Sequence, residues 1–260
     1  MKTWYCLLLS ILALALSSCL EHKSTLSLNK DGSGTITEET TLSAEASAMV
    51  EQMSAMGGEA KGNNWADRDK AEKRAKEMGE GVTVKEVAEI DKDGRKGGRV
   101  VFAFEDVNKL KYTPGDSLSD MSEGMGPQEE KPESEPVKMT YEDGLLTIVN
   151  PEPAKTDKPD APAQEIDPSQ LEMAKGMFDG MRITSVLVLP GGIKETNASY
   201  VDGDTITLMD MDMGKLVAQP EKFRKFAAAQ PETLDDMKEL IEGVDGIKVE
   251  TAKKVTVRLK

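Results

Sequence analysis

Apolar and polar residues alternate along much of the chain, and this alternation predicts β-strands joined as hairpins. The first two segments flank a Gly-rich turn at residues 30–34, and a later pair flanks the Asp-Gly turn at residues 142–144. Such turns are typical of hairpins because their residues accept positive φ angles. The turn between the second pair of strands is expected at residues 91–97. The expected strands are residues 24–29, 35–42, 82–90, 98–104, 137–141, 145–149, 183–189, 195–201, 205–211, 247–250 and 255–259.

A helical spacing of apolar residues appears between these strands. Ser43 can cap one helix and Asn63 or Asn64 the next, since both residue types accept hydrogen bonds from backbone amides at a helix start. The second helix carries only a narrow stripe formed by Ala71, Ala75 and Met78, which favours packing on a sheet with most of its surface in water. The expected helices are residues 43–56, 65–78, 167 or 169 to 181, 220–229 and 231–243.

Together these elements predict an α+β fold, mostly an antiparallel sheet built from β-hairpins with helices packed on one face. Two stretches rich in acidic residues, proline or glycine are expected to be long disordered loops. Strands before and after them are expected to share one sheet, and the sequence leaves open whether there is one domain or two. The predicted divisions are 1–18 (signal), 19–112 (first part of the domain), 113–136 (acidic loop), 137–150 (hairpin), 151–167 (Pro-rich linker) and 168–260 (second part of the domain).

The first residues of the chain form an export signal. Lys2 precedes an apolar run at residues 7–16, which is too short to span a bilayer and is followed by small residues. The signal ends Leu-Ser-Ser-Cys at Cys19, which resembles the lipobox of bacterial lipoproteins. That resemblance implies cleavage after Ser18, a diacylglycerol thioether on Cys19 and acylation of the new amine. Several acyl chains anchor a protein stably, and Leu20 after the cysteine implies the outer membrane by the sorting rule of enteric bacteria.

Composition excludes several classes of protein. The only other cysteine, Cys6, lies within the signal, so the mature chain keeps no thiol for a disulfide, metal site or nucleophile. The net charge is −14 and aromatic residues make up 4% of the chain, which argues against nucleic-acid binding. The 15 methionines indicate that Met fills core positions that Phe and Leu fill elsewhere.

Short turn motifs carry a resemblance to a known family. They are Asp31-Gly32-Ser33-Gly34, the Met-Arg-Ile-Thr stretch from Met181, Leu189-Pro190-Gly191, Asn197-Ala198 and Gly203-Asp204-Thr205. In these motifs, which cover the first hairpin and residues 177–211, the chain is similar to uncharacterised bacterial lipoproteins of the LppM-like domain family. The resemblance implies a membrane-tethered, β-rich domain flanked by helices, with lipid or glycolipid contact. The chain departs from the family in its acidic inserts and in lacking a C-terminal transmembrane helix, and no residue role is carried over.

Catalytic motifs are absent from the sequence. His22 is the only histidine, three residues after the predicted lipid, and we expect it to be a spacer residue. There is no G-x-S-x-G elbow, P-loop or G-x-G-x-x-G, so no cofactor is expected. Carboxylates are numerous enough that carboxylate-dependent hydrolysis stays open as an alternative, without a specific pair of residues to support it.

One stretch suggests metal chemistry. Alternation from Met209 through Met211 to Met213 would place three thioethers on one strand face, and such soft ligands select Cu(I). The competing interpretation is a strand whose methionines pack into a Met-rich core, and this interpretation is favoured.

The leading hypothesis is a lipid-anchored lipoprotein of the cell envelope that is not an enzyme. It would bind or scaffold an envelope protein or a lipid, with the membrane contacted through the N-terminal anchor. A carboxylate-dependent hydrolase and a Met-based Cu(I) site are the alternatives.

Overall fold

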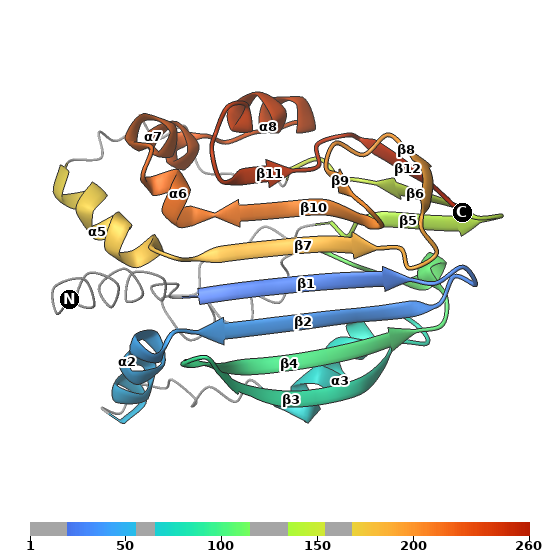
Figure 1. Ribbon diagram of the computed structural model, residues 1–260, viewed down its shortest axis with the longest axis horizontal. Coiled ribbons are helices and arrows are strands. Elements are labelled where there is room, and N and C mark those ends of the chain that lie inside the picture. Colours follow the sequence, from blue (N-terminus) through green and yellow to red (C-terminus); the bar gives the residue numbers. More distant parts are fainter. Residues whose placement is uncertain (1–19, 56–65, 115–134, 154–167) are drawn as a thin grey trace, which may run out of the picture.

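The computed structural model describes residues 20–55, 66–114, 135–153 and 168–260. Its strands form an eight-stranded sheet in the order β11-β10-β7-β1-β2-β4-β3, with β9 beside β10, and a four-stranded sheet in the order β5-β6-β12-β8 (Figure 1). The strands of the large sheet are β1 (Leu20–Leu28), β2 (Gly34–Leu42), β3 (Thr83–Lys92), β4 (Arg95–Phe104), β7 (Arg182–Val188), β9 (Val201–Asp202), β10 (Thr205–Asp212) and β11 (Ile247–Val249). Those of the small sheet are β5 (Lys138–Glu142), β6 (Leu145–Val149), β8 (Ile193–Thr196) and β12 (Lys254–Leu259).

The α+β class with a largely antiparallel sheet, predicted from alternation, is confirmed. The helices lie on the surface of the large sheet and beside its strand ends. No helix in the described ranges is long and apolar enough to cross a membrane. The helices are α2 (Ala44–Ala55), α3 (Arg68–Glu77), the 3-10 turn η2 (Val107–Lys109), α5 (Pro168–Phe178), α6 (Met213–Val217), α7 (Pro220–Ala228) and α8 (Leu234–Ile241).

Hairpin turns confirm two predictions and correct one. β1 and β2 pair from Leu20 opposite Leu42 to Leu28 opposite Gly34, and β5 and β6 pair around Asp143-Gly144. The expected loop at residues 91–97 is wrong, because β3 and β4 continue to a two-residue turn at Asp93-Gly94. Both residues of that turn have positive φ, as a tight hairpin turn requires, so the strands need no longer connection.

Helix starts also differ from the sequence prediction. The helix expected from residue 65 begins at Arg68, and Asp67 caps it by accepting a 3.1 Å bond from the Lys70 amide. The last helix begins at Leu234, where Thr233 and Asp236 form a capping box. In both cases a side chain that satisfies free amides decides the first residue.

A single parallel pairing joins the two halves of the chain. β7 lies beside β1 with Glu21 opposite Arg182 and Ser27 opposite Val188. This confirms that strands on both sides of the inserts share a sheet. The hairpin β5–β6 does not join that sheet, however, since β6 pairs with β12 in the small one. The predicted loops at 113–136 and 151–167 fall mostly on residues outside the described ranges.

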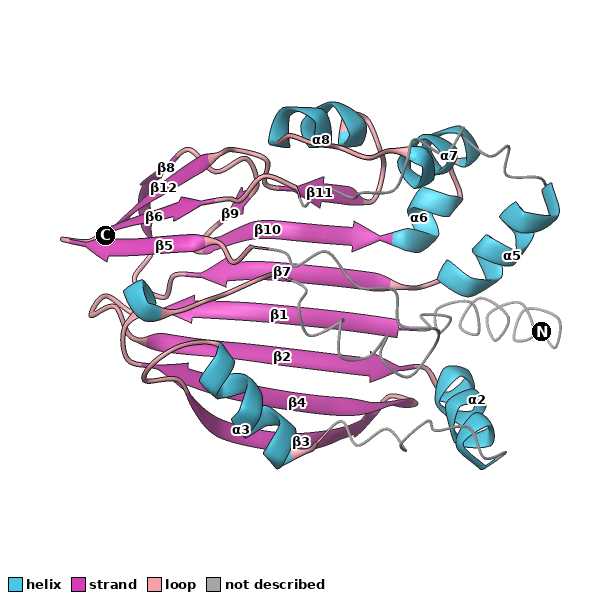
Figure 2. Cartoon of the chain, turned by 180° about the vertical axis from the view of Figure 1, so that it is seen from behind, coloured by secondary structure: helices cyan, strands magenta, loops and turns pink. Residues whose placement is uncertain are grey.

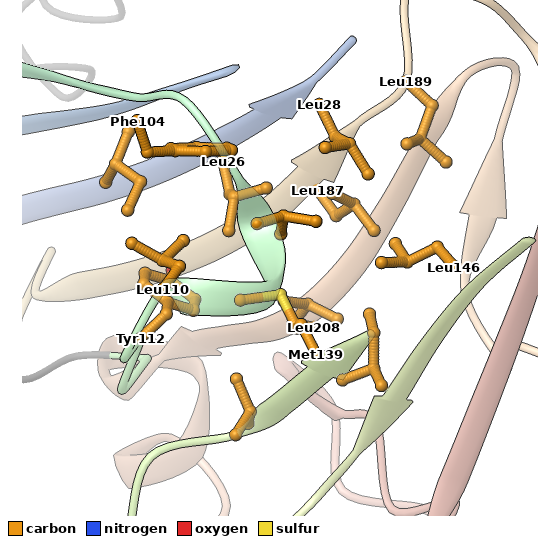
Figure 3. Close-up of a cluster of buried hydrophobic side chains, with 14 of the residues drawn as sticks. Leu26, Leu28, Phe104, Leu110, Tyr112, Met139, Leu146, Leu187, Leu189 and Leu208 are labelled. Atoms are coloured by element: carbon orange, nitrogen blue, oxygen red, sulfur yellow. The ribbon is translucent and has the colours of Figure 1, made fainter. Parts of the chain in front are cut away.

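The main core lies between the two sheets and beneath α3. Strand alternation directs Leu26, Leu28, Ile36, Phe102 and Leu187 to one face of the large sheet, which we call the inner face. Leu146 and Met139 of the small sheet lie close to Leu187 and Leu208 (Figure 3). Helix α3 crosses the same face with its narrow stripe buried, as the sequence predicted (Figure 2). The opposite, outer face carries mainly threonine and charged residues.

A smaller core holds the C-terminal helices against β11. Leu216, Val217 and Phe223 form its centre with Ile241 and Ile247. The ring of Phe223 lies 6.2 Å from that of Phe178 in α5, in a tilted arrangement. This second core fixes α5, α6 and α7 beside the end of the sheet where β1 begins, and α8 alongside β11 (Figure 1).

Candidate functional site

The predicted lipid attachment point adjoins the large sheet directly. Cys19 lies outside the described residues, but its chain neighbour Leu20 is the first residue of β1. Leu20 pairs with Leu42 at the last position of β2, and Glu21 pairs with Arg182 at the first position of β7. We call the end of the sheet where β1 begins the anchored end.

Three helices lie at the anchored end. α2 starts two residues after Leu42, and α5 ends four residues before Arg182. α6 follows β10 at the same end, where the Met213 amide donates a 2.9 Å bond to the Met181 carbonyl. Because these connections are short, α2, α5 and α6 must all lie close to the start of β1, as Figure 1 shows.

A cluster of buried polar side chains lies on the inner face near this end. We call it the polar cluster. It is assembled from β1, β2, α3, β7 and the segment after η2. Its members are His22, Ser24, Glu38, Thr40, Arg74, Tyr112 and Ser185.

The Tyr112 hydroxyl links two strands of the polar cluster. It lies 3.0 Å from Ser24 Oγ in β1 and 2.7 Å from Ser185 Oγ in β7, and these two serines are register partners. All three side chains are at most 2% exposed. Burial raises the pKa of Tyr112, so the phenol stays protonated and serves as a hydrogen-bonding bridge.

Glu38 and Arg74 form a two-pronged ion pair between β2 and α3. Arg74 Nη1 lies 2.8 Å from Glu38 Oε2, and Arg74 Nη2 donates a 2.9 Å bond to Glu38 Oε1. The Arg74 side chain is 18% exposed and the Glu38 side chain is 8% exposed. Parallel donors of this kind match a carboxylate well and hold α3 in one orientation on the sheet.

His22 is fully buried, so the prediction of a spacer residue is wrong. Its Nδ1 lies 2.8 Å from the Thr40 hydroxyl across the hairpin. Burial, together with the nearby positive charge of Arg74, lowers the pKa of His22 to about 4. The imidazole is therefore neutral at pH 7. The strand begins at Leu20, so a residue only three places after Cys19 already lies in the sheet.

The hydroxyl groups of the polar cluster have different partners. Ser24 and Ser185 bond Tyr112, whereas the Thr40 hydroxyl lies 2.8 Å from His22 Nδ1. With a pKa of about 4, His22 is a weak proton acceptor for that hydroxyl at neutral pH. The arrangement is that of groups that satisfy one another inside a fold.

Other carboxylates are engaged in structure. Glu250, which is 3% exposed, accepts bonds from the Ser199 amide at 2.6 Å and the Ala252 amide at 3.0 Å. On the outer face Asp210 accepts two 2.9 Å bonds from Arg182, and these bonds lower its pKa. Local hydrogen bonds likewise lower the pKa values of Asp31, Glu152 and Asp236.

The methionine stretch does not form the strand face that the sequence suggested. β10 ends at Asp212, so Met213 is the first residue of α6. Asp212 caps that helix by accepting a 3.0 Å bond from the Lys215 amide, which ends the alternation. Met211 and Met213 pack against the smaller core, and Met209 is half-buried in β10. In the described ranges no group of three or more His, Cys, Asp or Glu side chains could hold a metal ion.

The polar cluster was missed in the sequence because its members are far apart along the chain. Tyr112 and Ser185 come from segments on either side of the inserts. One signal was present: His22 and Ser24 have the same parity in β1 as the core residues Leu26 and Leu28. Alternation therefore places both on the inner face, where polar groups need partners.

Comparison with known proteins gives little. No protein-family model matches the chain, and no curated protein matches it in sequence. Among solved structures, the chain is similar to the folded domain of the LppM protein of Mycobacterium tuberculosis, with 11% sequence identity and a TM-score of 0.38. The similarity covers 93% of this chain and 90% of the LppM domain.

Proposed function

We propose that this protein is a lipoprotein of the bacterial cell envelope, anchored by lipid on Cys19, and that it acts as a non-enzymatic binding module. The observation that carries the proposal is the position of the lipobox. Its cysteine immediately precedes Leu20, the first residue of β1, so cleavage after Ser18 removes the signal and leaves every strand of the fold. The residue after the cysteine is leucine, which favours the outer membrane.

The non-enzymatic part of the proposal rests on how the buried polar groups are used. Glu38 pairs with Arg74, Tyr112 bridges two serines, and Glu250 holds the loop before β12. Here the polar groups bind one another and stabilise the fold.

The rival hypothesis is a hydrolase that uses two carboxylates. General acid catalysis by such an enzyme needs a carboxyl group with a raised pKa. The pKa values of four carboxyl groups, those of Asp31, Glu152, Asp210 and Asp236, are displaced in the opposite direction, downward. This favours the binding module.

The anchor is tested by intact-mass analysis of protein purified from membranes, beside a Cys19→Ala variant. We expect the wild type to begin at Cys19 and to carry three acyl chains with the glycerol group, and the variant to leave the membrane fraction. An unmodified mature chain in the wild type would contradict the proposal.

The binding role is tested separately by affinity capture from detergent-solubilised membranes with the lipidated protein. We expect recovery of a particular envelope protein or lipid that an unrelated lipoprotein of similar charge does not retain. Enrichment of nothing beyond that control would count against a binding role without affecting the anchor.

A further inference from the structure

We infer that the anchored end of the large sheet rests on the bilayer. The strands then stand roughly perpendicular to the membrane plane, and the domain stays close to the membrane surface. The inference rests on the proposed lipidation of Cys19 and adds the interaction surface: the contact is made by the start of β1, the adjoining ends of β2, β4 and β7, and the helices α2 and α5.

The first step is the length of the connection. Adjacent Cα atoms lie about 3.8 Å apart, so a lipid on Cys19 is held within one residue of the sheet. Leu20 is already fixed by its pairing with Leu42, and Glu21 is fixed between Thr41 and Arg182. A flexible linker would let the domain move away from the bilayer, but the chain has no residue between the predicted anchor and β1.

The second step is the direction of the strand. β1 has nine residues from Leu20 to Leu28, which at about 3.3 Å per residue extend roughly 30 Å from the anchor. The turn after Leu28, the start of β10 and the turn between β5 and β6 lie at the opposite end of the molecule (Figure 1). With the anchored end on the bilayer, the far end would therefore stand roughly 30 Å above it, a difference that can be measured.

The experiment uses the absence of a free thiol in the lipidated chain. Single cysteines replace exposed residues at the anchored end, Gln52→Cys in α2 and Glu172→Cys in α5, or at the far end, Glu142→Cys in β5 and Asp202→Cys in β9. Each is labelled with a fluorophore in vesicles of phosphatidylethanolamine and phosphatidylglycerol that contain lipids with a nitroxide on the headgroup. We expect quenching at Gln52 and Glu172 to be at least threefold stronger than at Glu142 and Asp202.

A length variant sharpens the test. Ten Gly/Ser residues inserted between Cys19 and Leu20 give a flexible spacer with a root-mean-square length of roughly 17 Å. We expect this spacer to remove most of the difference between the two ends. Equal quenching at all four positions without the spacer would overturn the inference, since the domain would then lie flat or move freely.

Intact mass of the same samples separates the two proposals. Acylated protein with no difference between the ends refutes the upright orientation and leaves the lipoprotein assignment in place. Protein without acyl mass refutes the lipoprotein assignment, and the orientation fails with it.

Discussion

Two bidentate arginine–carboxylate pairs lie on opposite faces of the large sheet. Arg74 binds Glu38 on the inner face with contacts of 2.8 and 2.9 Å, and Arg182 binds Asp210 on the outer face with two contacts of 2.9 Å. The arginine side chains are 18% and 50% exposed, respectively. Water replaces a lost partner more readily on the outer face than on the inner one, so two bidentate pairs need not contribute equally to stability.

The largest expected effect is the loss of the inner arginine. Arg74→Met leaves the Glu38 carboxylate buried without its cation, which typically costs about 3–5 kcal/mol in the free energy of unfolding. Arg182→Met is the matched control and should cost about 1 kcal/mol or less. Chemical denaturation of both variants measures the difference. Similar losses for the two variants would contradict the contrast between the faces.

Acid should destabilise the inner face through His22. Its pKa is about 4 in the folded state, below the ordinary value of 6.5, so between these values the unfolded chain binds the extra proton. The stability contributed by neutral His22 is therefore complete above pH 6.5 and is lost as the pH falls toward 4, by about 3 kcal/mol in all.

The sole histidine makes this effect easy to isolate. The difference in unfolding free energy between pH 7 and pH 4.5 should be smaller in His22→Gln than in the wild type. NMR titration of the one imidazole should show no protonation until the pH approaches 4. A midpoint near 6.5 would mean that His22 lies in solvent.

A smaller effect is expected where the inner face leaves no room for a side chain. A Cβ on Gly34 would collide with the Ser27 carbonyl and the Phe104 ring, so Gly34→Ala should cost about 2 kcal/mol of stability. At Gly176 in α5 the same Cβ would meet nothing within 4 Å. Gly176→Ala should stabilise the protein by about 0.5–1 kcal/mol through helix propensity. Thermal unfolding of the two variants should move in opposite directions.

The smallest expected loss of stability follows from the removal of a single buried hydroxyl. Tyr112→Phe removes the bridge between Ser24 and Ser185 and leaves two buried hydroxyls with fewer partners, at a cost of about 1–2 kcal/mol. Tyr141→Phe is the control, because its hydroxyl donates to the Lys30 carbonyl in an exposed bond. Denaturation midpoints should fall more for the Tyr112 variant, and the reverse order would mean that the bridge contributes nothing.

Local patterns explain which parts of the fold were predictable. The β1–β2 and β5–β6 hairpins were predicted because alternation and turn residues lie within a few positions of one another. The α3 stripe of Ala71, Ala75 and Met78 was predicted to lie on a sheet, and it does. The predicted length of the β3–β4 turn was wrong, because the turn consists of Asp93 and Gly94 alone. The charged residues on either side of it pair as strands, although their sequence does not alternate between apolar and polar.

The candidate site was predicted only in part. Cys19 follows from a local motif, and its lipidation stays a prediction. The polar cluster could not be predicted, because Ser24, Tyr112 and Ser185 meet only once β1 and β7 pair and the segment after η2 crosses them. The prediction that Met209, Met211 and Met213 share one strand face was wrong, because Asp212 caps helix α6 and the strand ends there. The alternation of Met and Asp residues gave no sign of this helix start.

By itself the sequence determined the β1–β2 and β5–β6 hairpins, because each depends on residues close together in the chain. The same kind of local pattern predicts the signal and the lipid on Cys19. Tertiary structure decided that β1 and β7 lie side by side, that β5–β6 joins a separate sheet, and that His22 is buried. Those outcomes depend on which apolar faces pack against one another. The packing partners lie in segments more than 100 residues apart, so local sequence patterns do not specify them. The proposed orientation on the membrane combines both: a local motif supplies the anchor, and long-range pairing fixes the sheet to it.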